Sequence, residues 1–171
     1  MEQDMQSYPL VVKDGRVVPE LLDVFRLVKD YDGVLGTAHV SPEECKIVVE
    51  AARNAGVKKL VVTHPEWWLV GMSVEDQVRL VKDYDVILER CYAQNLGGGK
   101  YKSNLPDNLE IIKTVGYKNV MVDTDGGQVE NPHWELAMEA YMQYLLDHGI
   151  PEEQVRYMTH DIPAGLLGIE N

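Results

Sequence analysis

The chain has 171 residues, of which 45% are hydrophobic and 26% charged, and its formal net charge is -12. This length suits one compact domain, and the apolar content is sufficient for a buried core. A strongly acidic surface repels a phosphate backbone, so we expect no nucleic-acid partner. The only two cysteines, Cys45 and Cys91, lack metal-type spacing and indicate no disulfide framework.

Targeting and membrane segments are not expected. The N-terminus, MEQDMQSYPL, has no basic region followed by an apolar stretch, so it does not read as a signal peptide. No run approaches the roughly 20 apolar residues that span a bilayer. The expected location is the cytoplasm, with no membrane partner.

The first predicted element is a hairpin at residues 10–18, LVVKDGRVV, because Asp14-Gly15 separates two apolar pairs. Pro19 suits the first position of a helix that follows. From Gly33 onward, an apolar run followed by a helical pattern occurs four times. The runs occupy residues 33–39, 58–64, 86–91 and 119–125.

The helices between these runs carry clear boundary signals. Ser41-Pro42-Glu43-Glu44 predicts an N-cap, a proline in the first turn and a capping box, and Gly56 ends that helix. Later helices are expected from Ser73, after Pro106 and from Asn131-Pro132, with two short pieces near residues 151–158 and 163–167.

The four apolar runs predict a parallel sheet. They are continuously apolar rather than alternating, which is typical of parallel strands buried on both faces. Their spacing is regular, with 25 residues between His39 and His64 and between His64 and Glu89. We therefore predict an α/β fold, one domain over residues 1–171, with four strands in sequential order and helices on the outer side. A doubly wound domain of the flavodoxin type is a weaker alternative, because no phosphate-binding loop follows the first strand.

Candidate site residues stand at the ends of the predicted strands. Ligands bind beyond the carboxyl ends of parallel strands, and three of these ends carry His39, His64 and Asp125. Two imidazoles and a carboxylate are a plausible ligand set for a catalytic divalent metal. Either histidine alone can equally be a structural residue that hydrogen-bonds the backbone.

Other residues near these ends have two interpretations each. Asp123 shares a strand face with Asp125, as a second site carboxylate or a structural hydrogen-bonding group. The remaining strand offers Glu89, which we weigh below the other carboxylates, and Cys91, which we expect to be a buried small hydrophobe. The Trp67-Trp68 pair can line a substrate pocket or a subunit contact. Finally, Gly97-Gly98-Gly99 is expected to be a flexible loop, since no Gly-Lys-Ser/Thr precedes a helix there.

Three segments resemble the amidohydrolase superfamily, in which the fifth and sixth barrel strands end in His and the eighth in Asp. They are GTAHVSPEE (36–44), VEAARNAGVKKLVVTHPEW (49–67) and VMVDTDGGQ (120–128). The closing IPAGLLGI (162–169) is similar to the tail of many of these enzymes. More narrowly, residues 10–169 resemble an uncharacterised amidohydrolase-like family of predicted TIM-barrel metal-dependent hydrolases.

The resemblance implies a metal-dependent hydrolase. His39, His64 and Asp125 match its metal ligands, Asp125 also being the catalytic acid/base, and the expected metal is Zn2+. Metal-activated water would attack an amide, ester or related bond of a small-molecule substrate.

The sequence also departs from the superfamily pattern. It has no His-x-His pair and only four strand–helix units, whereas a full barrel needs eight in about 250 residues. We therefore expect half of a (β/α)8 barrel, the C-terminal half. The first half is absent because the chain is a fragment, because another chain supplies it, or because it was lost. We lean towards an enzyme that is incomplete alone, completed by a homo-oligomer or by a missing N-terminal half-barrel. The alternative is a non-catalytic half-barrel for binding or assembly.

Overall fold

A four-stranded parallel sheet forms the centre of the molecule. The structure is a computed structural model that describes residues 10–169; residues 1–9, where we expected no targeting signal, lie outside the described range. The strands follow the order β3-β4-β5-β8, each parallel to its neighbour. They are β3 (Val34–Gly36), β4 (Lys59–Val62), β5 (Ile87–Cys91) and β8 (Val120–Asp123). The predicted parallel sheet in sequential order is confirmed.

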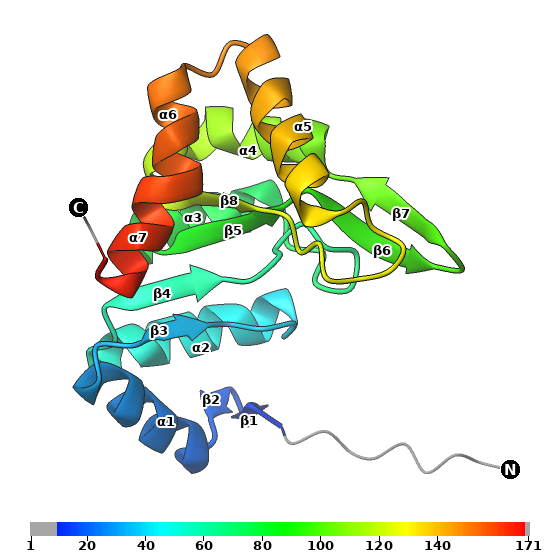
Figure 1. The fold of residues 1–171 in the computed structure, drawn as a ribbon. Coiled ribbons are helices and arrows are strands. Elements are labelled where there is room, and N and C mark those ends of the chain that lie inside the picture. The colour runs from blue at the N-terminus through cyan, green and yellow to red at the C-terminus, as the bar shows by residue number, and fades with distance from the viewer. Residues whose placement is uncertain (1–9, 170–171) are drawn as a thin grey trace, which may run out of the picture.

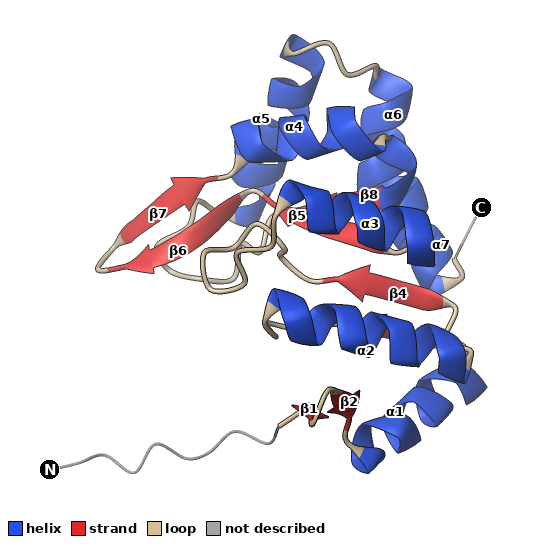
Figure 2. Ribbon diagram, turned by 180° about the vertical axis from the view of Figure 1, so that it is seen from behind, coloured by secondary structure: helices blue, strands red, loops and turns tan. Residues whose placement is uncertain are grey.

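Helices α2, α3 and α4 cover one face of this sheet (Figures 1 and 2). The main helices are α1 (Pro19–Asp30), α2 (Pro42–Ala55), α3 (Val74–Tyr84), α4 (Leu105–Val115) and α5 (Trp134–Asp147). Leu60, Val62 and Leu88 pack against α2 and α3 in one apolar cluster. Val120 and Val122 pack against α4 and α5 in a second. Alternate side chains of β4, β5 and β8 therefore point to the opposite face, where the chemistry lies.

The helix boundaries at α2 and α3 follow their predicted caps. The Ser41 hydroxyl accepts the N–H of Glu44 while the Glu44 carboxylate accepts the N–H of Ser41, so the capping box is confirmed. Gly56 ends α2 in the left-handed conformation, with φ 93°. The Ser73 side chain caps α3. These caps fix the points at which the chain leaves the loops that follow β3 and β4.

The C-terminal helices cross the other face of the sheet. Instead of two separate pieces, α6 (Glu152–Arg156), the π-helical turn η2 (Tyr157–Asp161) and α7 (Ile162–Leu167) follow without a break. In Figure 1 α7 lies in front of the strands and α3 behind them. Because η2 also packs against β8, this segment covers the sheet near the amino ends of its strands, and the predicted half-barrel does not include such a cover.

Two antiparallel hairpins accompany the sheet. The first joins β1 (Val12–Lys13) to β2 (Arg16–Val17) around Asp14-Gly15, as predicted. The second joins β6 (Ala93–Gly97) to β7 (Lys100–Ser103), so the loop predicted at Gly97-Gly98-Gly99 is the turn of a hairpin whose two strands were not predicted. All three glycines have positive φ, which a tight turn requires and glycine adopts without strain.

The remaining differences are local. Helix α5 begins at Trp134 instead of Asn131-Pro132, and the Asn131 side-chain amide instead donates to the Asp125 carbonyl within the preceding loop. A short 3-10 helix, η1 (Tyr117–Asn119), leads into β8. No helix within residues 10–169 is long and apolar enough to cross a membrane.

Candidate metal centre

The loops at the carboxyl edge of the sheet bring His39, His64 and Asp125 close together. His39 follows β3, His64 follows β4 and Asp125 follows β8. His64, Asp125 and Ala38, next to His39, have positive φ values of 42°, 44° and 54°. Side chains other than glycine rarely adopt this conformation, and it occurs often at functional sites.

His64 is the centre of this group. Its Nε2 lies 4.0 Å from Asp125 Oδ2, and its ring stacks on that of His39 with 5.4 Å between centroids. A flat sheet would hold Asp125 about 10 Å away, two strand spacings from β4. The loop after β8 removes that separation by folding Asp125 back towards His64.

The tightest set of donor atoms uses the other ring nitrogen of His64. Its Nδ1 lies 2.8 Å from Cys91 Sγ and 3.4 Å from Glu89 Oε2. The donor atoms of His64, Glu89 and Cys91 all lie within 4.8 Å of one another, close enough to hold one metal ion. The two nitrogens thus face two different neighbourhoods, Cys91 and Glu89 on one side and Asp125 on the other.

Carboxylate chemistry around this set fits a divalent cation. Glu89 Oε2 and Asp123 Oδ1 are buried and have no hydrogen-bond partner among residues 10–169. Burial, then the charge of Asp123, raises the pKa of Glu89 to about 8, against the opposing effect of His64. Burial also raises the pKa of Asp123, against the opposing effect of the neighbouring Cys91 and Glu89 side chains. Buried carboxylates of this kind are costly alone and are satisfied by a cation.

The donor set combines nitrogen, oxygen and sulfur. Cys91 is 2% exposed, and burial together with the charges of Asp123 and Glu66 raises the pKa of its thiol. A neutral, buried thiol is a poor nucleophile. A bound cation would favour the thiolate, because coordinating thiols lose their proton. Cys91 therefore suits the role of a ligand better than that of a nucleophile.

An aromatic wall borders the site. The Trp67 ring meets His39 edge-on at 4.6 Å and His64 at 6.2 Å between centroids. Burial, followed by the charge of His64, lowers the pKa of His39, with Asp125 acting in the opposite direction. His39 is thus a neutral imidazole near pH 7, able to accept a proton.

The sequence predicted His64 as a ligand, whereas its two closest partners, Glu89 and Cys91, were considered but given less weight. Cys91 is buried, as expected of a small hydrophobe, yet it also contacts an imidazole. A signal was available, since Glu89 and Cys91 are two apart on one strand and so share its face. The proposed ligand set of His39, His64 and Asp125 remains a prediction, and Asp123 lies beside Glu89.

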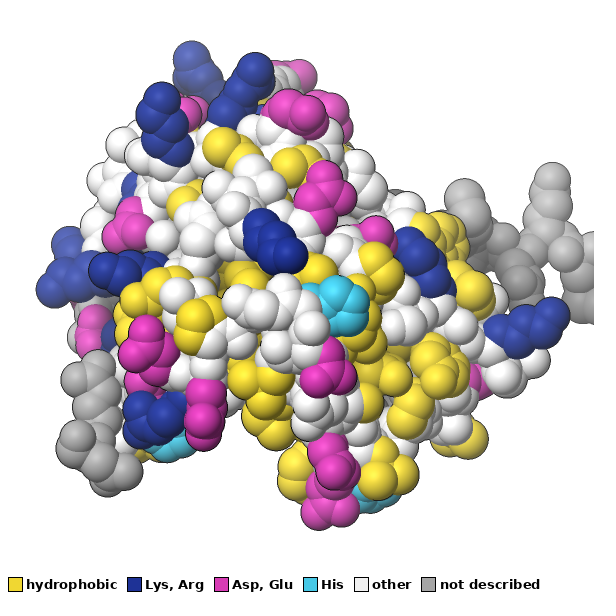
Figure 3. Space-filling model, turned by 90° about the horizontal axis from the view of Figure 1, so that it is seen from above, with side chains coloured by type: hydrophobic (Ala, Val, Ile, Leu, Met, Phe, Trp, Pro, Cys, Tyr) yellow, Lys and Arg dark blue, Asp and Glu magenta, His cyan; other side chains and the backbone are white. Residues whose placement is uncertain are grey.

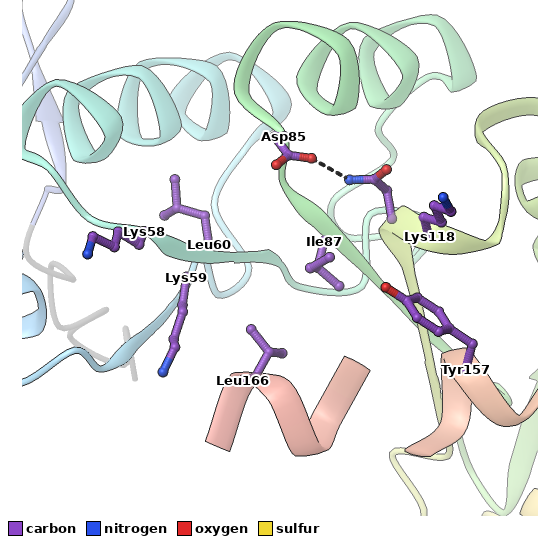
Figure 4. A pocket seen from close by; sticks show the side chains of 9 residues that line it. Lys58, Lys59, Leu60, Asp85, Ile87, Lys118, Tyr157 and Leu166 are labelled. Atoms are coloured by element: carbon purple, nitrogen blue, oxygen red, sulfur yellow. Dashed lines mark hydrogen bonds between the residues drawn. The ribbon is translucent and has the colours of Figure 1, made fainter. Parts of the chain in front are cut away.

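A hollow at the opposite end of the sheet offers no comparable convergence. It has a volume of about 410 Å³, and its walls include Lys58, Lys59 and Lys118. Figure 4 shows the three amino groups pointing in different directions. Lys59 already pairs with Asp32 at 2.8 Å. The convergent side chains are at the carboxyl edge instead.

Comparison with known proteins places the chain in a family without assigning a role. Residues 2–89, which are 88 of the 171, match DUF6282, a family of unknown function, and the chain belongs to this family. No curated protein matches, and no solved structure matches.

Proposed function

We propose that the chain carries a divalent metal centre held by His64, Glu89 and Cys91, and that it acts as a metal-dependent hydrolase of the amidohydrolase type. The observation that carries the proposal is the convergence of an imidazole nitrogen, a thiol and buried, unpartnered carboxylate oxygens at one point. Mixed nitrogen, oxygen and sulfur donors favour Zn2+ over Mg2+ or Ca2+. A bound divalent cation supplies Lewis-acid chemistry, the activation of water and the polarisation of an amide or ester carbonyl.

The residues around this centre have separate roles in the proposal. Asp125, with a 42% exposed side chain 4.0 Å from His64 Nε2, is the candidate proton acceptor on the side of the imidazole ring away from Cys91 and Glu89. His39, whose pKa is lowered chiefly by burial, is the second candidate proton acceptor. Trp67 limits access on one side and provides an apolar surface for a small substrate.

The proposed architecture is half of a (β/α)8 barrel. Sequential parallel strands with α2, α3 and α4 on one face support it, as does the gathering of side chains at the carboxyl edge. The crossing of η2 and α7 over the inner face is the feature that such a half-barrel does not need. If another chain supplies further strands to complete a barrel, η2 and α7 have to move away from the inner face.

Metal affinity tests the proposal directly. Zn2+ titration of the metal-free chain should show one site, with Cys91→Ser and Glu89→Gln each weakening it at least tenfold. Cys45→Ser is the matched control, because Cys45 is also a buried free cysteine but lies in the apolar core. Equal affinity in wild type and Cys91→Ser would contradict the metal centre.

Non-catalytic binding or assembly is the second candidate. Large apolar side chains are exposed on the segments beyond the sheet, among them Trp68, Leu69 and Val129 on loops, Leu96 on β6 and Trp134 at the start of α5. Figure 3 shows apolar patches between charged groups on the face seen from above. Exposed patches of this kind mark interaction surfaces. A chain that binds Zn2+ yet hydrolyses no activated ester faster than the Cys91→Ser variant would favour this role.

A further inference from the structure

On the side facing β4, the backbone of Cys91 is held by buried side chains instead of by a strand, whereas on its other side Cys91 is in register with Asp123 of β8. In the ladder between β4 and β5 the last pair is Val62 and Leu88, so no residue of β4 stands opposite Cys91. Glu66, from the loop after β4, takes that place, because its Oε1 accepts the N–H of Cys91 at 3.0 Å. On the carbonyl side, Asn108 donates to Cys91 at 2.9 Å. Both backbone groups at the end of β5 are therefore fixed.

Glu66 is in turn held by Arg90. Arg90 Nη1 lies 3.3 Å from Glu66 Oε2, with side chains that are 2% and 4% exposed. The same guanidinium donates to Gln77 on α3 and to Asn108 on α4, both at 2.9 Å. Glu66, Arg90 and Asn108 thus form a closed network around Cys91 that ties the loop after β4 to the helical face of the sheet.

An apolar core would be the cheaper arrangement at this position. Replacing a buried ion pair by apolar side chains of the same volume is often neutral or stabilising, so a buried pair is weak evidence of a role in stability. Here the network leads to one place, the end of β5, where Cys91 Sγ lies 2.8 Å from His64 Nδ1. Glu66 also stands two residues after His64. One loop therefore carries both the imidazole and the carboxylate that holds the Cys91 backbone, which we call the Glu66 clamp.

We propose that Glu66 and Arg90 are positioning residues that hold the Cys91 sulfur against His64 for metal binding. This inference rests on the proposed metal centre. Glu66 acts through the Cys91 amide and Arg90 acts through Glu66, and neither binds the ion. Partners of metal ligands typically contribute 10- to 100-fold to affinity.

Cobalt binding tests the inference, because a thiolate ligand gives Co2+ a charge-transfer absorption that other donors do not. The chain loaded with Co2+ should show this band, and Cys91→Ser should abolish it. Glu66→Ala should weaken Co2+ binding by about 10- to 100-fold. It should also reduce the charge-transfer absorption per folded molecule. Glu66→Gln, whose amide oxygen can still accept from Cys91, should restore most of both.

A purely structural role predicts a different pattern. Asn119→Ala is the control for general destabilisation, because Asn119 bonds Asp85 and the Val86 carbonyl at the far end of β5. It should lower the melting temperature and leave the band unchanged. If Glu66→Ala behaves like this control, the positioning role is overturned.

Hydrogen exchange separates this inference from the proposed function. In the metal-free chain, Glu66→Ala and Arg90→Met should speed exchange of the Cys91 amide at least tenfold more than that of the Leu88 amide. Arg90→Lys should do so less, and remains informative if Arg90→Met fails to fold. Wild type without a thiolate band overturns the metal centre. Unchanged exchange of the Cys91 amide in Glu66→Ala overturns the positioning role of Glu66, whether or not the chain binds a metal.

Discussion

Glu89 links the chemistry of the site to the stability of the metal-free chain. Its pKa is raised to about 8 in the folded protein, chiefly by burial and then by Asp123, whereas an unfolded chain has the ordinary value of 4.5. Below pH 4.5 both states hold the proton, so stability is fully present. Between pH 4.5 and 8 the unfolded state loses its proton first, and stability falls as pH rises.

We therefore expect the free energy of unfolding, measured with urea in a chelator, to decrease across this window by at most about 1.4 kcal/mol per pH unit. Glu89→Gln should flatten the decrease and be the more stable protein at pH 8. Saturating Zn2+ should reverse the order, since a ligand stabilises only the protein that binds it. Glu135→Gln, an exposed carboxylate on α5, is the control. A wild-type profile as flat as that of Glu89→Gln would contradict the buried charge.

The outer residues of the site distinguish the two ligand sets. If His64, Glu89 and Cys91 hold the ion, Asp125→Asn and His39→Ala should change Zn2+ affinity less than tenfold, or about 1.4 kcal/mol. The same variants should lose most of any ester hydrolysis, because the proton acceptors are gone. Calorimetric titration beside a steady-state assay measures both. A hundredfold loss of affinity in either variant would instead support His39, His64 and Asp125 as ligands.

At the scale of the element, α2 depends on its cap. The Ser41 hydroxyl bonds both the N–H and the carboxylate of Glu44. Ser41 stands two residues after His39, so this cap lies in the loop that follows β3. Ser41→Ala should lower the free energy of unfolding by about 1 kcal/mol, as the loss of an N-cap does. Ser73→Ala, which removes a cap without a capping box, should lower it less. Urea unfolding at pH 7 measures both, and an unchanged midpoint in Ser41→Ala would show that the cap contributes nothing.

Local signals predicted these elements well where the chain itself supplies the bonds. The Ser41 capping box and the Asp14-Gly15 turn are complete within a few residues, so the sequence contains all that determines them. The β6–β7 hairpin was missed because its strands carry no apolar alternation and three glycines read as a loop. Its position depends on distant contacts instead, such as the Gln94 side chain that accepts the Trp68 N–H and donates to Asn104.

The site shows the same division between local and distant determinants. Strand ends carrying His39, His64 and Asp125 were predictable, because parallel strands bring their carboxyl ends to one edge. The pairing of Cys91 with His64 was not, since it depends on the Glu66 clamp and on which ring nitrogen faces inward.

At the scale of the whole molecule, the sheet order followed from the four strand–helix units. The path of η2 and α7 over the inner face did not, because no periodicity encodes it.

The exposed edge of the sheet leads to a prediction about assembly. Within residues 10–169, β3 is paired only with β4, and its other edge is free for hydrogen bonding. Val34 is 39% exposed on the face opposite Leu35, which packs in the core. Free edges with apolar side chains promote association. We therefore expect the chain to self-associate, with a sedimentation coefficient that rises with concentration.

Val34→Glu tests where this association occurs. A buried charge on the β3 edge is unfavourable in an interface, so the variant should sediment as a monomer where wild type does not. Val24→Glu is matched in chemistry and exposure, because Val24 is 43% exposed on helix α1 and is not part of the strand edge, and it should associate like wild type. Both variants should keep the thermal transition of wild type within a few degrees. Wild type that stays monomeric over a wide concentration range would refute the prediction, and equal behaviour of the two variants would move the contact away from β3.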